Sequence, residues 1–157
     1  MSANNPQQRT WPVRPLWVFN GLLVAALLIA GLVMHGGETV EKSFPSYAKT
    51  SAAERGWLTP LTPPTATGIR LKYDLDTNHR ILTFSYPGSF DVQLIQHCRQ
   101  VTAGDIRRPV LTAGWWPKDL SGGSLPVTPR HSFYECRAEN GFLALDARRN
   151  KAYFWSY

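Results

Sequence analysis

The chain has 157 residues, which is enough for one domain with attached segments. Apolar residues make up 43% of the sequence and the formal net charge is +6, as is ordinary for a folded protein. The longest basic runs are the pairs Arg107-Arg108 and Arg148-Arg149, and the other cations are scattered. Because nucleic-acid-binding proteins gather their cations on one face or in runs, the composition argues against a nucleic-acid partner.

An uncharged apolar run, LWVFNGLLVAALLIAGLVM, covers residues 16–34. In a helix this run spans roughly 28 Å, close to the thickness of the hydrocarbon core of a bilayer. It is longer than the apolar core of a secretory signal peptide, and no small-x-small cleavage pattern follows it. The sequence predicts one uncleaved transmembrane helix over 16–34, with the lipid bilayer as its partner. A cleaved signal peptide and a buried soluble helix are the alternatives.

The flanking charges predict an orientation for this helix. Residues 1–15 contain two arginines and no acid, whereas Glu38 and Glu41 are the first charged residues after the apolar run. Positively charged flanks stay on the cytoplasmic side of a membrane. We therefore expect a disordered cytoplasmic tail over 1–15. Residues 35–157 are expected to lie outside the inner (plasma) membrane, in the periplasm or the extracellular space.

Cys98 and Cys136 are the only cysteines, and both lie in the predicted exported part. Because such compartments are oxidising, we predict a disulfide between them, with two buried free thiols as the alternative. The disulfide would close a loop of about 39 residues and stabilise the fold by roughly 4 kcal/mol. The four histidines lack the spacing of a zinc site, so no metal and no cofactor is predicted.

The exported part is expected to begin with a tether over 35–50, where Gly, Pro, Ser and Thr mix with charged residues. The predicted outer domain covers residues 51–157. Ser51 and Glu54 at its start have the spacing of a capping box, which predicts a short helical turn. The stretch WLTPLTPPTATG at 57–68 carries three prolines, so it is not expected to form a regular element.

Strand patterns dominate the rest of the domain. The alternating runs GIRLKYDL and RILTFSYP flank the turn residues DTNH and predict a hairpin over 68–87. The stretch GSFDVQLIQHCRQV at 88–101 has apolar residues at helical spacing, with Ser89 as N-cap. Three further strands are predicted at residues 131–139, 141–147 and 152–157. The expected fold class is α+β, with an antiparallel sheet of about five strands and one main helix.

Residues 103–131 form a long predicted loop that is rich in glycine and proline, and long loops of this kind are usually functional or disordered. The loop contains GWWPKDL at 114–120. Neighbouring side chains in an extended chain point to opposite faces, and a residue before proline favours extended geometry. One of Trp115 and Trp116 is therefore expected in the core and the other becomes a candidate binding residue. The alternative is that both are structural.

No catalytic or metal-binding residue is predicted. The segment DLDTN at 74–78 begins like a calcium loop, but His79 replaces the required glycine and Ser85 replaces the bidentate glutamate. A hairpin turn fits that segment better. The sequence also lacks the G-x-S-x-G pattern of a nucleophile elbow, and His97 and Cys98 diverge if they lie on one helix.

Several short sequence segments together resemble small bacterial membrane-attached proteins of the YbbD head-domain family, over about residues 50–157. These segments are GWLTPLTPPTATGIRLKYDLDTN at 56–78, WWPKDL at 115–120, FYEC at 133–136 and AYFWSY at 152–157. The resemblance implies a small extracytoplasmic domain. It implies no established catalytic chemistry and transfers no site residue.

The sequence thus predicts a single-pass, membrane-anchored extracytoplasmic binding or interaction module. It would be an accessory to another envelope protein or a ligand sensor. One alternative is an envelope enzyme with a site in the 103–131 loop, using Asp105, Asp119 or His131. The other is a structural membrane subunit that acts through its helix, where Gly21 and Ala25 have the small-xxx-small spacing of close helix packing.

Overall fold

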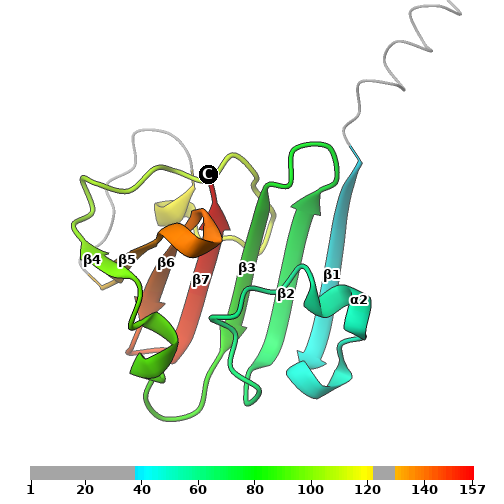
Figure 1. The fold of residues 1–157 in the computed structure, drawn as a ribbon, viewed down its shortest axis with the longest axis horizontal. Helices are drawn as coiled ribbons and strands as arrows, with labels where there is room; N and C mark the ends of the chain where they lie inside the picture. The colour runs from blue at the N-terminus through cyan, green and yellow to red at the C-terminus, as the bar shows by residue number, and fades with distance from the viewer. Residues whose placement is uncertain (1–37, 122–129) are drawn as a thin grey trace, which may run out of the picture. The chain divides into compact units, whose positions relative to one another are not determined.

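The computed structural model of the protein describes residues 38–121 and 130–157 (Figure 1). The predicted tail over 1–15 and the predicted transmembrane helix over 16–34 lie outside these ranges. Within them, no helix combines the length and the apolar character that crossing a bilayer requires.

Seven strands form one antiparallel sheet in the order β1-β2-β3-β7-β6-β5-β4 (Figure 1). Their bounds are β1 Thr39–Ser46, β2 Thr67–Asp74, β3 Arg80–Ser85, β4 Arg99–Val101, β5 Ser132–Cys136, β6 Gly141–Asp146 and β7 Lys151–Ser156. Two meanders, β1 to β3 and β4 to β7, meet where β3 pairs with β7. The chain therefore crosses from the centre of the sheet to its far edge between β3 and β4.

The helical elements are short. They are η1 Tyr47–Lys49, α2 Ala52–Arg55, η2 Val92–Ile95, η3 Lys118–Leu120 and η4 Arg137–Glu139. The predicted α+β class is therefore wrong for the described residues, which form a mainly β fold with seven strands in place of five. The five predicted strands are present as β2, β3, β5, β6 and β7, and the predicted hairpin over 68–87 is confirmed.

The main helix predicted over 88–101 is absent. Asp91 caps only the single turn η2, where its carboxylate accepts a hydrogen bond from the Gln93 backbone N–H at 2.9 Å. The chain then straightens, and β4 pairs with β5 at the edge of the sheet. Pairing with a neighbouring strand outweighs the local helical period, because tertiary context decides the structure of short segments.

Residues 39–46 belong to the sheet and not to a tether. They form the edge strand β1, which pairs along its length with β2. Val40 and Phe44 of this strand pack against the core, Lys42 lies on the same side of the sheet, and Glu41 and Ser43 point to the other side. Composition concealed the strand because most of its residues are polar or charged.

The sheet is covered on both faces. Face A is the side to which Leu71, Leu82 and Phe154 point, and face B is the side to which Ile81, Tyr153 and Trp155 point. Segments 47–66 and 86–98 supply the residues that cover face A, and Figure 1 shows the first of them crossing in front of β2 and β3. The segment 102–121 covers part of face B. All six residues of β6 are consequently buried, as is typical of a strand between two layers.

The predicted disulfide is confirmed, since Cys98 and Cys136 are bonded to each other. Cys98 lies between η2 and β4, and Cys136 is the last residue of β5. The covalent bond therefore fixes the start of the three-residue strand β4 beside the strand with which it pairs.

The predicted capping box of α2 is also confirmed. The Ser51 hydroxyl accepts from the Glu54 backbone N–H at 3.2 Å, and the Glu54 carboxylate accepts from the Ser51 backbone N–H at 2.8 Å. Lys42 of β1 donates to the same carboxylate at 3.0 Å. The hydrogen bonds that the carboxylate accepts, the one from the Ser51 backbone first and the one from Lys42 second, lower the pKa of Glu54 to about 2.

We expect the Glu54 carboxyl group to titrate near pH 2 in the folded chain instead of near 4.5. Because the folded pKa lies below the unfolded one, the stabilisation is complete above about pH 4.5 and is lost as the pH falls towards 2. NMR titration of the side-chain carboxyl carbon measures this value. Replacing Lys42 with methionine should raise the pKa part of the way, and a wild-type midpoint near 4.5 would contradict the geometry.

Candidate functional site

The segment 102–121 places the two adjacent tryptophans in different surroundings on face B. Trp116 is only 4% exposed, and its ring meets those of Tyr153 and Trp155 edge-on at centroid distances of 5.8 and 6.1 Å. Trp115 is half-buried at the outer side of the same cluster. The structure therefore gives Trp116 a core position and leaves part of the Trp115 ring available for contact.

The sheet holds Trp115 in place through two hydrogen bonds. The indole Nε1–H of Trp115 donates to Glu41 Oε1 at 2.6 Å, and Lys72 Nζ donates to the backbone oxygen of Thr112 at 2.9 Å. Glu41 and Lys72 are direct neighbours across β1 and β2. These two adjacent side chains on face B thus fix the part of the segment 102–121 around Trp115, so that the Trp115 ring lies beside β1 and β2.

Beside Trp115, face B is hollowed by a depression of about 450 Å³, here called the Trp115 groove. Trp115 forms its wall, and the polar part of its lining consists of Ser43, Arg70, Thr83, Ser85, Lys151 and Tyr153. The strand register places four of these residues in one row across the sheet: Ser43, Arg70, Thr83 and Tyr153. Ser85 and Lys151 face each other in the next row. The floor is therefore made of sheet residues whose relative positions are fixed by strand pairing.

The Trp115 groove is positively charged. Arg70 and Lys151 are the cations of its lining, and none of its lining residues is acidic. In the part of the chain that the structure describes, neither cation makes an ion pair. Thr83 is engaged within the sheet, because its hydroxyl donates to the backbone oxygen of Ala152 at 3.0 Å. The groove thus combines two uncompensated cations with a partly exposed aromatic ring.

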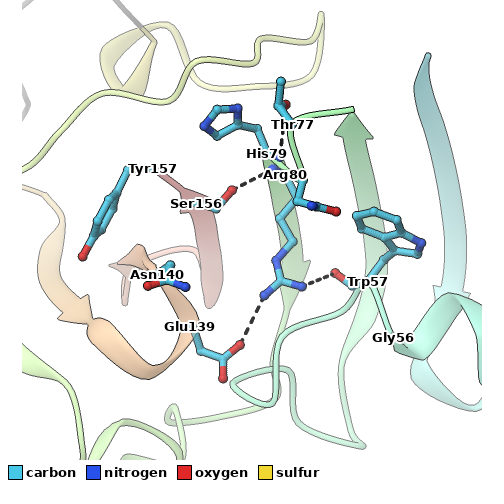
Figure 2. A pocket seen from close by; sticks show the side chains of 10 residues that line it. Gly56, Trp57, Thr77, His79, Arg80, Glu139, Asn140, Ser156 and Tyr157 are labelled. Atoms are coloured by element: carbon cyan, nitrogen blue, oxygen red, sulfur yellow. Dashed lines mark hydrogen bonds and ion pairs between the residues drawn. The ribbon is translucent and has the colours of Figure 1, made fainter. Parts of the chain in front are cut away.

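A second depression of about 550 Å³, here called the Arg80 hollow, lies between the β2–β3 turn, η4 and the end of β7 (Figure 2). The Arg80 guanidinium donates to Glu139 Oε2 at 3.2 Å and to the backbone oxygen of Trp57 at 3.3 Å. Its backbone N–H donates to the Ser156 hydroxyl at 2.8 Å. Burial lowers the pKa of Arg80, and the nearby Glu139 carboxylate opposes that shift. Arg80 therefore links three segments, and its charge is compensated inside the protein.

Replacing Arg80 with alanine is expected to lower the free energy of unfolding by about 3 kcal/mol, because it leaves the largely buried Glu139 carboxylate without its cation. Urea unfolding followed by circular dichroism measures the loss. Arg70→Ala is the matched control, since Arg70 is exposed and unpaired among the described residues, and we expect less than about 0.5 kcal/mol there. Equal losses in the two variants would contradict the structural role of Arg80.

Asp119 and His131, two of the three residues considered for an enzyme, lie close together. His131 Nδ1 is 3.7 Å from Asp119 Oδ2, and burial lowers the pKa of His131 while Asp119 opposes the shift. The other imidazole nitrogen, Nε2, accepts from Arg130 Nε at 3.3 Å and so faces a cation instead of a nucleophile. Asp105 lies apart, where its carboxylate accepts from Thr102. This geometry favours a structural role for His131.

Sequence reasoning selected Trp115 and Trp116 but none of the polar floor of the groove. The available signal was the polar side of the alternating run over 68–75, which includes Arg70 and Lys72. A sheet covered on one face leaves such a side in solvent. The path of the segment 102–121 over face B cannot be read from this pattern. In the structure Lys72 contacts that segment, whereas Arg70 lies outside it and lines the groove.

The family model of the YbbD head domain matches residues 38–85, which comprise β1 to β3 and the segment 47–66. The match begins and ends earlier in the chain than the resemblance predicted over about 50–157. The sequence segments at 115–120, 133–136 and 152–157 therefore lie beyond the matched residues. No curated protein and no solved structure matches the chain. The predicted family resemblance is confirmed over residues 38–85, where the chain matches the model of the YbbD head domain.

Proposed function

We propose that this protein is an extracytoplasmic binding module that contacts an envelope protein or a ligand through the Trp115 groove. The observation that carries the proposal is the Trp115 ring itself, which is half-buried, held by Glu41 and placed next to an uncompensated positive floor. Tryptophan is favoured at the energetic centres of interfaces. Because the ring is already fixed in the free protein, little conformational entropy is lost when a partner binds.

The proposed location is the outer side of the inner (plasma) membrane, with the N-terminus in the cytoplasm. The uncharged run over 16–34 and the charges that flank it support an anchor of this orientation. The Cys98–Cys136 disulfide supports an oxidising compartment such as the periplasm or the cell exterior. In this arrangement the Trp115 groove is available to other proteins of the envelope and to soluble ligands.

The proposed role is binding and not catalysis. General acid-base chemistry needs a titratable group within hydrogen-bond reach of the reacting atoms. The lining of the Trp115 groove contains no carboxylate or imidazole, and burial raises the pKa of its one phenol, Tyr153, so that this group stays protonated at neutral pH. The buried His131 is held between Asp119 and Arg130 and lies outside this lining.

Co-purification from native membranes in mild detergent tests the proposal. We expect a stoichiometric partner to accompany the wild-type chain and to be lost from Trp115→Ala. The matched control is Val110→Ala, because Val110 lies in the same segment, is 68% exposed and is absent from the groove lining. Circular dichroism should show that both variants fold. Retention of the partner by Trp115→Ala, or recovery of the wild-type chain alone, would contradict an interaction through Trp115.

A further inference from the structure

We infer that the Trp115 groove recognises a soluble ligand with two anionic groups, carboxylates or phosphates, joined by a short hydroxylated spacer. The inference rests on the proposed function, because it assigns a ligand class to the same groove. Its starting point is the pair Arg70 and Lys151, which line one depression without an acidic neighbour in that lining.

The two cations lie at opposite sides of one strand. Arg70 on β2 pairs with Thr83 on β3, and Lys151 on β7 pairs with Ser85, two residues further along β3. From ordinary strand spacings, the Cα atoms of Arg70 and Lys151 are roughly 12 Å apart. Two long cationic side chains at this separation suit two anionic groups on one small molecule better than a single ion.

The carboxylates nearest to the two cations are already engaged. Asp146, the cross-strand neighbour of Lys151, is buried, accepts from the Arg149 backbone N–H at 3.2 Å and lies 3.5 Å from Arg130 Nε. On the other side of the groove, Glu41 accepts the indole N–H of Trp115. The positive charge of the lining is therefore available to a ligand. Anionic groups of that ligand would accept charge-assisted hydrogen bonds, which are stronger than those between neutral groups.

Two hydroxyl groups lie near the cations. Ser85 is on β3, between the strands that carry Arg70 and Lys151, and Ser43 is on β1, on the far side of Arg70. Such groups donate to and accept from the hydroxyls of a polyol. The Trp115 ring forms an apolar wall at the side, against which the C–H face of the spacer can lie. A volume of about 450 Å³ is that of a small-ligand site, and its polar floor does not suit a hydrocarbon chain.

The Arg80 hollow provides the internal comparison. It is larger, but its guanidinium already pairs with Glu139, so its charged groups compensate each other. A ligand held by two anionic groups is therefore expected in the Trp115 groove and not in the Arg80 hollow.

Isothermal titration calorimetry on the full-length chain in mild detergent tests the inference. The probes are fructose 1,6-bisphosphate for phosphates, glucarate for carboxylates, and sorbitol as the neutral control. We expect at least one dianion to bind, sorbitol not to bind, and Arg70→Ala and Lys151→Ala each to weaken binding about tenfold or more. Arg148→Ala, an exposed arginine outside the groove, should leave the affinity unchanged.

Two results would overturn the inference: no binding of either dianion, or binding that persists in the Arg70→Ala, Lys151→Ala double variant. These results test the ligand class, and the co-purification experiment tests the proposed function independently. If the dianions do not bind but Trp115→Ala loses its protein partner, the ligand class is wrong and the interaction surface is retained. If the dianions bind while Trp115→Ala keeps its partner, the ligand class is supported and the protein-partner role of Trp115 is wrong.

Discussion

Replacing Cys98 and Cys136 together with alanine is expected to lower the free energy of unfolding by about 4 kcal/mol. The disulfide joins residues 38 positions apart, and without it the unfolded chain regains the conformational freedom of that loop. The loss is large beside the total stability of a small domain, which is typically about 5–15 kcal/mol. Urea unfolding of the variant and of the wild-type chain measures it.

The position of the disulfide adds a local expectation. β4 has only three residues, pairs on one side with β5, and follows Cys98 directly. Amide hydrogen exchange over 99–101 should therefore accelerate in the double variant more than exchange in β6, which is paired on both sides. Reduction of the wild-type disulfide should reproduce both effects. A loss below about 1 kcal/mol would show that the covalent bond adds little to the packing.

Trp116→Ala is expected to lower the free energy of unfolding by about 3–5 kcal/mol, the usual cost of deleting a buried aromatic side chain. The Trp116 ring fills the space between Tyr153 and Trp155 on face B, so its removal leaves a cavity between two layers. Trp115→Ala should cost less than about 1.5 kcal/mol, because that ring is half-buried and loses one hydrogen bond to Glu41. Urea unfolding of the two variants gives the comparison.

A conservative variant separates packing from hydrogen bonding at Trp116. Among the described residues, the buried Trp116 Nε1–H has no acceptor. Trp116→Phe keeps most of the ring volume and removes this unpaired donor, so we expect a loss well below that of Trp116→Ala. If alanine at position 116 destabilises no more than alanine at 115, the assignment of Trp116 to the core is wrong.

Period-2 alternation predicts β2, β3 and β5, and short apolar runs that follow turns predict β6 and β7. β1 also alternates, but its sequence TVEKSFPS contains a proline and two charges, so composition suggested a tether. β4 was hidden by apolar residues at helical spacing over 88–101. The pairing of β4 with β5 decides that segment, and no local pattern contains that pairing.

The two tryptophans could be selected from the sequence, because residue type and the proline after them predicted that their side chains diverge. The groove could not be predicted. Its floor depends on β3 and β7 being neighbours, which places Thr83 beside Tyr153 although they are far apart in the chain. Its wall depends on the hydrogen bond between Trp115 and Glu41, and Glu41 belongs to β1, whose composition predicts a tether.

Site-specific photo-cross-linking in native membranes is the most direct test of binding at the Trp115 groove. A benzophenone amino acid replaces Ser43 in the groove floor or, as the control, the exposed Leu75 outside the groove. Binding of a partner protein through the groove predicts a discrete cross-linked species from position 43 that is absent from position 75 and is lost when Trp115→Ala is added. Cross-linking from position 75 alone, or from neither position, would contradict contact of a partner protein at the groove.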